Sequence, residues 1–370
     1  MKTSSIKDFN FLIKKHRFNK IFILTGKNSF YKSKACDLLK IPKNKSVKFY
    51  FKLSKLPEFN ELIKIILEIY KFKPDVILAI GGGAVIDYAK ICSIVNNEQT
   101  SNLKKKLINY LDISKKKTYP LIAVPTTAGS GAEVTSNAVI YINKIKYSVE
   151  SNLLVPDYFF LIEELIIKNS FQLKSASGFD AIAQAMESLI SLKSNKSSVY
   201  FAKQSLKLSL KNYLPFLNKP TRENSKQMLL ASNLAGKAIN ISKTTAPHAV
   251  SYPFTSLFGI DHGHAVSLTL EKFLLFNYKN MKYSNSNFDL SRRYKIIFEL
   301  FNVKNVFELN QKLKFIKSRA KLVDTYKDLN IDINSSINKI LDQINILRLK
   351  NNPVDISKND LIKILHDKIL

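Results

Sequence analysis

The stretch DVILAIGGGAVIDYAK, residues 75–90, predicts the fold of the first half of this 370-residue chain. Residues 76–80 form a continuous apolar run, which is typical of a central parallel strand. Three glycines follow directly and lead into a helical pattern. Glycines let a phosphate approach the backbone closely, and a helix N-terminus offers unpaired N–H groups. The junction therefore predicts a dinucleotide-binding turn, although a glycine triplet also suits an ordinary strand–helix connection.

The segments around this turn alternate between strand and helix patterns. Apolar, β-branched runs predict further strands at residues 20–26, 46–51, 121–127 and 136–142, and helical spacing is found at 29–40 and 59–72. Such an alternation is typical of a doubly wound α/β sheet. Strand signals stop near Ala176, beyond which nearly every segment has helical spacing.

Two domains are therefore expected in this chain. Residues 1–175 are predicted to form a doubly wound α/β dinucleotide-binding domain, and residues 176–370 an all-α domain. The polar residues 96–117 are expected to form a surface insertion.

A second loop, PTTAGSGAEVT at residues 125–135, follows the predicted strand at 121–127. Its hydroxyl groups and glycines suit a ribose, a phosphate or a nicotinamide amide, and equally an ordinary surface turn. Two such loops at the carboxyl ends of buried strands predict one shared cleft at that edge of the sheet.

The net charge of +29 raises the question of nucleic-acid binding. The lysines are spread along the whole sequence, and no Arg-rich arm, zinc-finger spacing or aromatic–basic motif is present. We expect no nucleic-acid partner. No apolar run reaches the about 18 residues that a membrane span needs, and the N-terminus lacks a signal-peptide core. A cytoplasmic protein with no membrane contact is expected.

Histidines cluster in the second half of the chain, where three of the five lie between residues 248 and 264. Asp180 and Gln184 are four residues apart on a predicted helix, so both project from one face. An aspartate with two histidines makes an open site for a divalent metal that can polarise a substrate oxygen. The competing interpretation is that Asp180 favours its helix dipole and the histidines are ordinary structural residues.

Four stretches of the chain resemble the iron-containing alcohol dehydrogenase family: GGGAVIDYAK, AVPTTAGSGAEVT, SGFDAIAQAMESLIS and APHAVSYPFTSLFGIDHGHAVSL. The resemblance implies a metal-dependent, NAD(P)H-linked alcohol dehydrogenase or aldehyde reductase, commonly a homodimer. It implies that a divalent metal, Fe²⁺ or Zn²⁺, is held by Asp180, Gln184, His248 and His262. It also implies a dinucleotide site made of Gly82, Gly83, Ala84, Asp87, Thr126, Thr127, Ser130, Thr135 and Lys146.

The chain departs from the family pattern at several positions. Gln184 stands where the family usually has a metal-binding histidine, and a glutamine oxygen is a weaker ligand. Ala84 and Ala132 replace the more usual serines, and Ile162 and Glu163 stand where Asp-Pro is frequent. Gln184 therefore predicts looser metal binding or a different metal, whereas the two alanines remove two hydroxyl groups from the loops.

The segment NLAGKAINISKTTAPHAVSYPFTSLFGIDHGHAVSLTL, residues 233–270, resembles members that act as phosphonoacetaldehyde reductases. That resemblance implies a small anionic aldehyde as substrate, held by Lys243 with Lys237 and Asn233, although both lysines also suit a plain surface role. His264 and Tyr252 are candidate proton donors, with a supporting or solvent-facing role as the alternative for His264.

Two rival functions stay open at this point. A sugar-phosphate cyclase resembling dehydroquinate synthase also pairs a dinucleotide with a metal. A non-catalytic basic binding protein, with a site that decayed at Gln184, is the second rival. The spacing of the second loop and of the histidines favours the dehydrogenase. Retention of Asp180, His248 and His262 argues against a decayed site.

Overall fold

The computed structural model describes residues 5–15, 18–95, 100–109 and 111–368. The chain divides into two compact units, Met1–Asn169 and Ser170–Leu370. The first is an α/β unit and the second is helical, which is the predicted fold class. The division falls a few residues before residue 175, because α8 (Phe171–Ile190) already begins after its N-cap Ser170. The small and polar residues in the first turns of this helix give no amphipathic pattern by which to locate its start.

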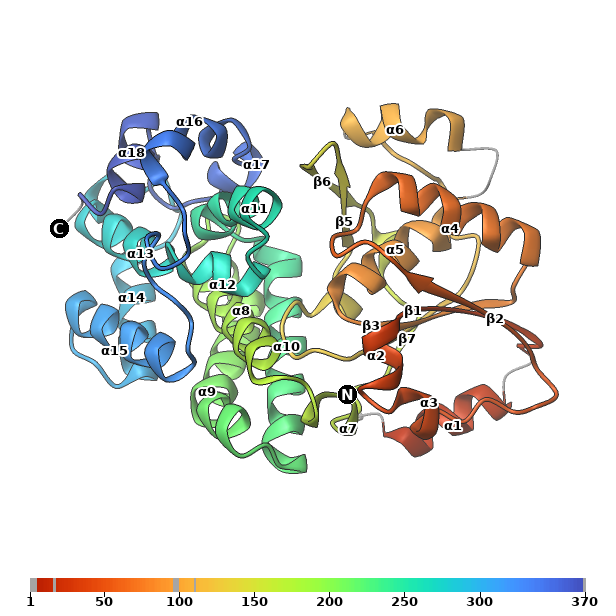
Figure 1. Ribbon diagram of the computed structural model, residues 1–370. Helices are drawn as coiled ribbons and strands as arrows, with labels where there is room; N and C mark the ends of the chain where they lie inside the picture. The colour runs from red at the N-terminus through yellow and green to blue at the C-terminus, as the bar shows by residue number, and fades with distance from the viewer. Residues whose placement is uncertain (1–4, 16–17, 96–99, 110, 369–370) are drawn as a thin grey trace. The chain divides into compact units, whose positions relative to one another are not determined.

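A parallel sheet forms the centre of the first unit, with strand order β2-β1-β3-β4-β7 (Figure 1). Its strands are β1 (Lys20–Gly26), β2 (Ser46–Lys52), β3 (Val76–Gly81), β4 (Leu121–Pro125) and β7 (Tyr158–Phe159). The predicted strands at 20–26, 46–51 and 121–127 and the apolar run at 76–80 are all found in this sheet. β3 is buried along its whole length, as its apolar sequence requires.

Helices cover both faces of this sheet, as a doubly wound fold requires (Figure 1). One apolar core lies between the sheet and helices α4 (Phe59–Phe72) and α5 (Gly83–Ile94). The other lies between the opposite face and helices α1 (Ile6–Lys15) and α3 (Ala35–Leu38). The turn between β3 and α5 is the glycine triplet, so the predicted strand–turn–helix context is confirmed.

Two segments of the first unit differ from the prediction, and the strand predicted at 136–142 is confirmed but lies outside the central sheet. Residues 29–40 do not form one helix but α2 (Lys27–Tyr31) and α3, separated by Lys34 at φ 63°. β5 (Asn137–Ile142) pairs with β6 (Ile145–Glu150) in a separate antiparallel hairpin. The expected polar insertion contains α6 (Thr100–Ile108), which buries Leu103 and Leu107 against the core, while residues 96–99 and 110 of it lie outside the described residues. Shorter elements are η2 (Ala132–Val134), η3 (Asn152–Leu154) and α7 (Glu164–Ile167).

The second unit is built around α8, which packs against α9, α10, α12 and α14. Its elements after α8 are α9 (Lys196–Asn218), α10 (Arg222–Ser242), α11 (Ala246–Phe258), α12 (His262–Ser267), α13 (Leu270–Lys279), η4 (Met281–Tyr283), α14 (Leu290–Phe301), α15 (Val306–Arg319), α16 (Ile333–Asp342), α17 (Ile346–Leu349) and α18 (Lys358–Leu365). Across the described part of the chain, no helix combines the length and the apolar character needed to cross a bilayer.

Candidate functional site

One face of α8 carries three buried polar side chains, Asp180, Gln184 and Glu187. Their spacing of four and three residues places them above one another on that face. Gln184 Nε2 donates a hydrogen bond to Asp180 Oδ2 at 2.9 Å, so the amide fixes the orientation of the carboxylate. α8 therefore presents a row of buried oxygen atoms inside the helical unit.

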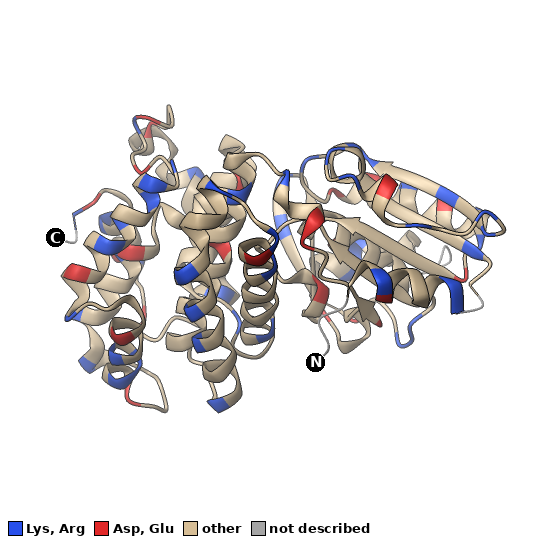
Figure 2. Cartoon of the chain, turned by 90° about the horizontal axis from the view of Figure 1, so that it is seen from below, with Lys and Arg blue, Asp and Glu red and all other residues tan. Residues whose placement is uncertain are grey.

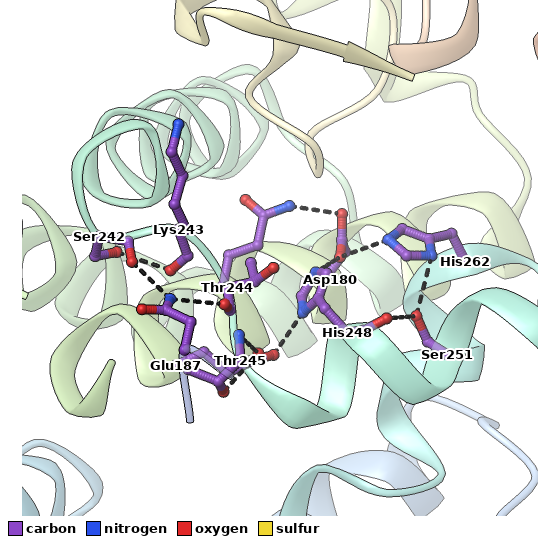
Figure 3. Close-up of polar contacts among 11 residues, drawn as sticks. Asp180, Glu187, Ser242, Lys243, Thr244, Thr245, His248, Ser251 and His262 are labelled. Atoms are coloured by element: carbon purple, nitrogen blue, oxygen red, sulfur yellow. Dashed lines mark hydrogen bonds and ion pairs between the residues drawn. The ribbon is translucent and has the colours of Figure 1, made fainter. Parts of the chain in front are cut away.

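The histidines of α11 and α12 meet this row at Asp180 (Figure 3). His248 Nε2 lies 3.2 Å from Asp180 Oδ1, and His262 Nε2 lies 4.0 Å from the same oxygen. The three side chains offer ligand atoms that all lie within 4.8 Å of one another. Ligands at about 2.1 Å from one tetrahedral ion would be about 3.4 Å apart, so small shifts suffice to close this cluster around a metal.

The donor set fits a divalent first-row metal, because one carboxylate and two imidazoles are ligands that such ions prefer. Gln184 Oε1 is buried and accepts no hydrogen bond from the residues that the structure describes. A buried oxygen without such a bond is costly unless another partner, such as an ion, satisfies it. Gln184 thus has two roles: its Nε2 orients Asp180, and its Oε1 can serve as a fourth ligand.

Glu187 holds the other side of the His248 ring (Figure 3). Its Oε1 lies 2.5 Å from His248 Nδ1, while its Oε2 accepts hydrogen bonds from the backbone N–H and the hydroxyl of Thr245. Burial lowers the pKa of His248, but Glu187 and Asp180 outweigh it and raise that pKa to about 9. A carboxylate on the far nitrogen fixes the tautomer and orientation of a metal-binding histidine.

His262 is less enclosed than His248 and has a different environment. Its ring stacks on Tyr252 at 5.6 Å between centroids, and its Nδ1 lies 3.5 Å from Ser251 Oγ. Tyr252 is buried, and burial raises its pKa to about 12. His264 instead donates its Nε2–H to the carbonyl oxygen of Val323 at 2.7 Å. The structure therefore places Tyr252 against the candidate metal ligand and engages His264 elsewhere.

The three predicted substrate residues have separate environments. Lys243 ends α10 with a positive φ of 59°, directly before the Thr244–Thr245 segment that contacts Glu187. In Figure 3 its side chain leaves this loop on the side opposite Glu187. Lys237 places its ammonium group over the ring of Phe201 at 5.8 Å, and Asn233 is buried in α10. Of the three residues, Lys243 is the one that is linked to the candidate metal ligands by the backbone, through the Thr244–Thr245 segment.

In the first unit, the glycine turn faces the second predicted loop. A Cβ atom added at Gly82 would lie 3.3 Å from Thr127 Oγ1, and one added at Gly83 would lie 3.0 Å from Ser130 Oγ. Thr126 N–H donates to the carbonyl of Gly81 at 3.0 Å, which joins the two loops. The N-cap residue of α5 is Gly82, which has no side chain to cap the helix, so the first N–H groups of α5 suit an anion. This cradle fits a dinucleotide phosphate.

Charged residues gather behind this turn. Burial raises the pKa of Asp87 to about 6, against the opposing charges of Lys90 and Lys146. Lys90 is fully buried and donates to Thr135 Oγ1 at 2.8 Å and to the carbonyl of Asn137 at 2.9 Å. Thr135, predicted as a cofactor contact, is therefore already bonded to a buried lysine that the sequence analysis did not single out. Ala84 lies in the first turn of α5.

The close approach of α12 to α8 depends on Gly263. A Cβ atom there would overlap the carbonyl oxygen of Ala176 and lie 2.8 Å from Asp180 Cβ. We expect Gly263→Ala to push α12 away from α8, to cost about 1–3 kcal/mol of stability, and to weaken metal binding. Urea unfolding and bound-metal analysis of the purified variant measure both effects.

The matched control is Gly259→Ala, because Gly259 has a positive φ of 69° and no atom within 4 Å of an added Cβ. This variant strains the backbone without displacing α12. Equal losses of metal in the two variants would contradict the role given to the Gly263 contact.

Two characterised dehydrogenases are similar in sequence to about half of this chain. The bifunctional aldehyde-alcohol dehydrogenase of Escherichia coli (strain K12) is 32% identical over 219 residues, which cover 56% of this chain and 24% of that protein. The 4-hydroxybutyrate dehydrogenase of Clostridium kluyveri is 31% identical over 194 residues, 51% of each. The chain thus spans only a quarter to a half of these curated relatives.

Solved structures match almost the whole chain. The sulfoacetaldehyde reductase of Bifidobacterium kashiwanohense, in complex with NAD⁺, has a TM-score of 0.85 at 25% identity and covers 98% of this chain and 94% of that one. An iron-containing alcohol dehydrogenase of Thermotoga maritima, with a TM-score of 0.79 at 23% identity and coverages of 98% and 94%, shares the fold.

Family profiles cover both units. Residues 1–162 match the profile of iron-containing alcohol dehydrogenase, and residues 174–369 match that of the C-terminal part of the Fe-containing alcohol dehydrogenase family. The first profile ends before the helical unit and the second begins within its first helix, and the second covers more than half of the chain. The chain belongs to the iron-containing alcohol dehydrogenase family.

Proposed function

We propose that this protein is a metal-dependent, NAD(P)H-linked aldehyde reductase that acts on a small anionic aldehyde. The observation that carries the proposal is the buried cluster of Asp180, His248 and His262, with Glu187 behind it. A divalent ion, Fe²⁺ or Zn²⁺, supplies carbonyl polarisation when bound, and NAD(P)H supplies the hydride.

The residues of the helical unit have distinct tasks in this proposal. Asp180, His248 and His262 hold the ion, and Gln184 orients Asp180 and offers its Oε1. Glu187 keeps the His248 ring turned with Nε2 toward Asp180. Tyr252 is the proposed proton donor to a nascent alkoxide because its ring stacks on His262. Burial raises the pKa of its phenol to about 12, and the hydroxyl is hydrogen-bonded to Thr244, so the phenol is protonated at neutral pH. His264 is a weaker candidate, since its Nε2–H is bonded to Val323.

The first unit is proposed to bind the dinucleotide. Gly82, Gly83 and Ala84 would receive the pyrophosphate at the N-terminus of α5, and Thr127 and Ser130 border the same turn. Thr126 and Thr135 support these loops through their own contacts, and Asp87 and Lys146 lie in the charged cluster behind them.

An anionic substrate is supported by Lys243 and by the relatives. The B. kashiwanohense protein reduces sulfoacetaldehyde, a two-carbon aldehyde with a tetrahedral anionic group. Phosphonoacetaldehyde has the same skeleton with a phosphonate. Lys243 follows α10 directly before the segment that touches Glu187, so its ammonium group is proposed to bind the anion.

The expected result for Lys243→Met is a loss of about 10–100-fold in kcat/KM for phosphonoacetaldehyde or sulfoacetaldehyde, since an ionic hydrogen bond contributes about 1.5–3 kcal/mol. A neutral aldehyde of similar size should lose less than about threefold by the same argument. NAD(P)H oxidation by the metal-loaded protein measures both. Lys282→Met is the control, because Lys282 lies in η4 with its ammonium group over the ring of Tyr283. Equal effects on charged and neutral aldehydes would exclude Lys243 as the anion site.

Lys and Arg side chains are distributed over the helices and strands of both units in Figure 2, as the chain-wide lysine content predicts. This distribution supports a small-molecule substrate rather than a nucleic-acid partner. The homodimer and the cytoplasmic location stay predictions of the sequence.

A further inference from the structure

Asn351 is a buried residue that follows Lys350, the C-cap of α17, and it lies far along the chain from the candidate metal ligands. Its Nδ2 lies 2.9 Å from the carbonyl oxygens of both Ser242 and Thr244 and 3.0 Å from Ser191 Oγ, so its two N–H groups are shared among three acceptors. Its Oδ1 accepts from the backbone N–H of Lys193 at 3.3 Å. One side chain therefore joins the end of α8 to the loop that follows α10.

The two carbonyls that Asn351 binds lie on either side of Lys243. This residue has φ 59° and ψ 174°, a backbone conformation that is almost confined to glycine. A lysine keeps such a conformation only where its surroundings hold it. Hydrogen bonds of Ser242 restrain the same backbone. Its carbonyl oxygen accepts from Ser191 Oγ, and its own hydroxyl donates to Ser188 Oγ at 2.9 Å.

The loop at residues 242–245 is connected to the candidate metal ligand His248 through Glu187. Thr245 donates from its backbone N–H and its hydroxyl to Glu187 Oε2, at 2.7 and 2.9 Å. The second oxygen of Glu187 lies 2.5 Å from His248 Nδ1. Asn351 thus contacts Thr244. From there the contacts continue through Thr245 and Glu187 to His248 (Figure 3).

We propose that Asn351 is a positioning residue for the metal centre and for Lys243. It fixes the Ser242–Thr245 loop in its strained conformation, so that Thr245 keeps Glu187 against His248 and Lys243 keeps its place beside the cluster. The inference rests on the proposed function, because it assigns Asn351 to the same metal site.

The test compares Asn351→Ala with Asn352→Ala in the full-length protein loaded with Zn²⁺. Asn352 is its neighbour and is equally buried, but its side chain bonds Asn277 and the carbonyl of Val354. Chelator competition measures Zn²⁺ affinity, and circular dichroism checks folding. We expect Asn351→Ala to weaken Zn²⁺ binding by about 10–100-fold, the usual effect of losing an outer support of a metal ligand, and Asn352→Ala to change it by less than about threefold.

Two further variants separate positioning from general stability. Lys243→Gly in the Asn351→Ala background should restore part of the Zn²⁺ affinity, because glycine adopts the loop conformation without strain. Thr245→Val keeps the shape of the side chain and removes its hydroxyl bond to Glu187, so it should weaken Zn²⁺ binding even if Asn351→Ala does not fold.

The outcomes distinguish this proposal from the proposed function. Normal Zn²⁺ affinity in folded Asn351→Ala, an equal loss in Asn352→Ala, or normal affinity in Thr245→Val would overturn the positioning role and leave the metal site intact. Absence of Zn²⁺ binding by the wild-type protein would overturn both.

Discussion

Replacement of His262 by alanine is expected to abolish metal-dependent aldehyde reduction and to release the metal. His262 is one of only three His, Cys, Asp or Glu side chains that converge on this point among the described residues, and its Nε2 lies 4.0 Å from Asp180 Oδ1. A metal that polarises a carbonyl contributes several kcal/mol to the barrier, so kcat/KM should fall by about 10³-fold or more. NAD(P)H oxidation and metal content of the purified variant are the measurements.

The control for this variant is His366→Ala, because His366 follows α18 as its C-cap residue. It tests whether loss of any histidine lowers metal content. An unchanged reduction rate with full metal content in His262→Ala would remove His262 from the site.

Glu187→Gln is expected to weaken metal binding by about 10–100-fold while the protein stays folded. Glutamine keeps the shape of Glu187 but removes the negative charge that faces His248 Nδ1. Its amide also replaces one of the two carboxylate oxygens that accept from Thr245 and contact His248. The ring of His248 then loses the partner that fixes its orientation. Chelator competition on the Zn²⁺-loaded protein measures the change.

The matched control is Glu271→Gln in the same unit. Glu271 is also buried, and it pairs with the ammonium group of Lys317. This variant should lower the denaturation midpoint without a change in metal affinity. If both variants lost metal to the same extent, Glu187 would have no special role at His248.

The central sheet could be predicted because each of its strands is recognisable from a short run of neighbouring residues. The apolar run 76–80 with the glycines after it needs no distant partner to be recognised. Residues 29–40 were harder, since a single residue at positive φ, Lys34, interrupts a helical pattern. α6 was missed because Leu103 and Leu107 become a buried face only when a core lies beside them.

The convergence of Asp180, His248 and His262 could be predicted from their spacing and from the family resemblance. The residues that support these three side chains could be predicted only in part. Glu187 lies seven residues after Asp180, so helical spacing could have placed it on the same face as Asp180 and Gln184. Thr245 and Asn351 carried no such signal. Their hydrogen bonds join segments separated by 58 and 109 positions, and such contacts exist only in the folded unit.

The most direct test of the account is a metal titration of aldehyde-dependent NAD(P)H oxidation, followed by the absorbance of the cofactor. The metal-free protein is loaded with Fe²⁺ or Zn²⁺ and given phosphonoacetaldehyde, sulfoacetaldehyde or a neutral aldehyde of similar size. We expect oxidation that rises with metal up to one ion per chain and prefers an anionic aldehyde. Oxidation of the neutral aldehyde alone would keep the reductase and reject the anionic substrate. No oxidation with either metal would contradict the central claim.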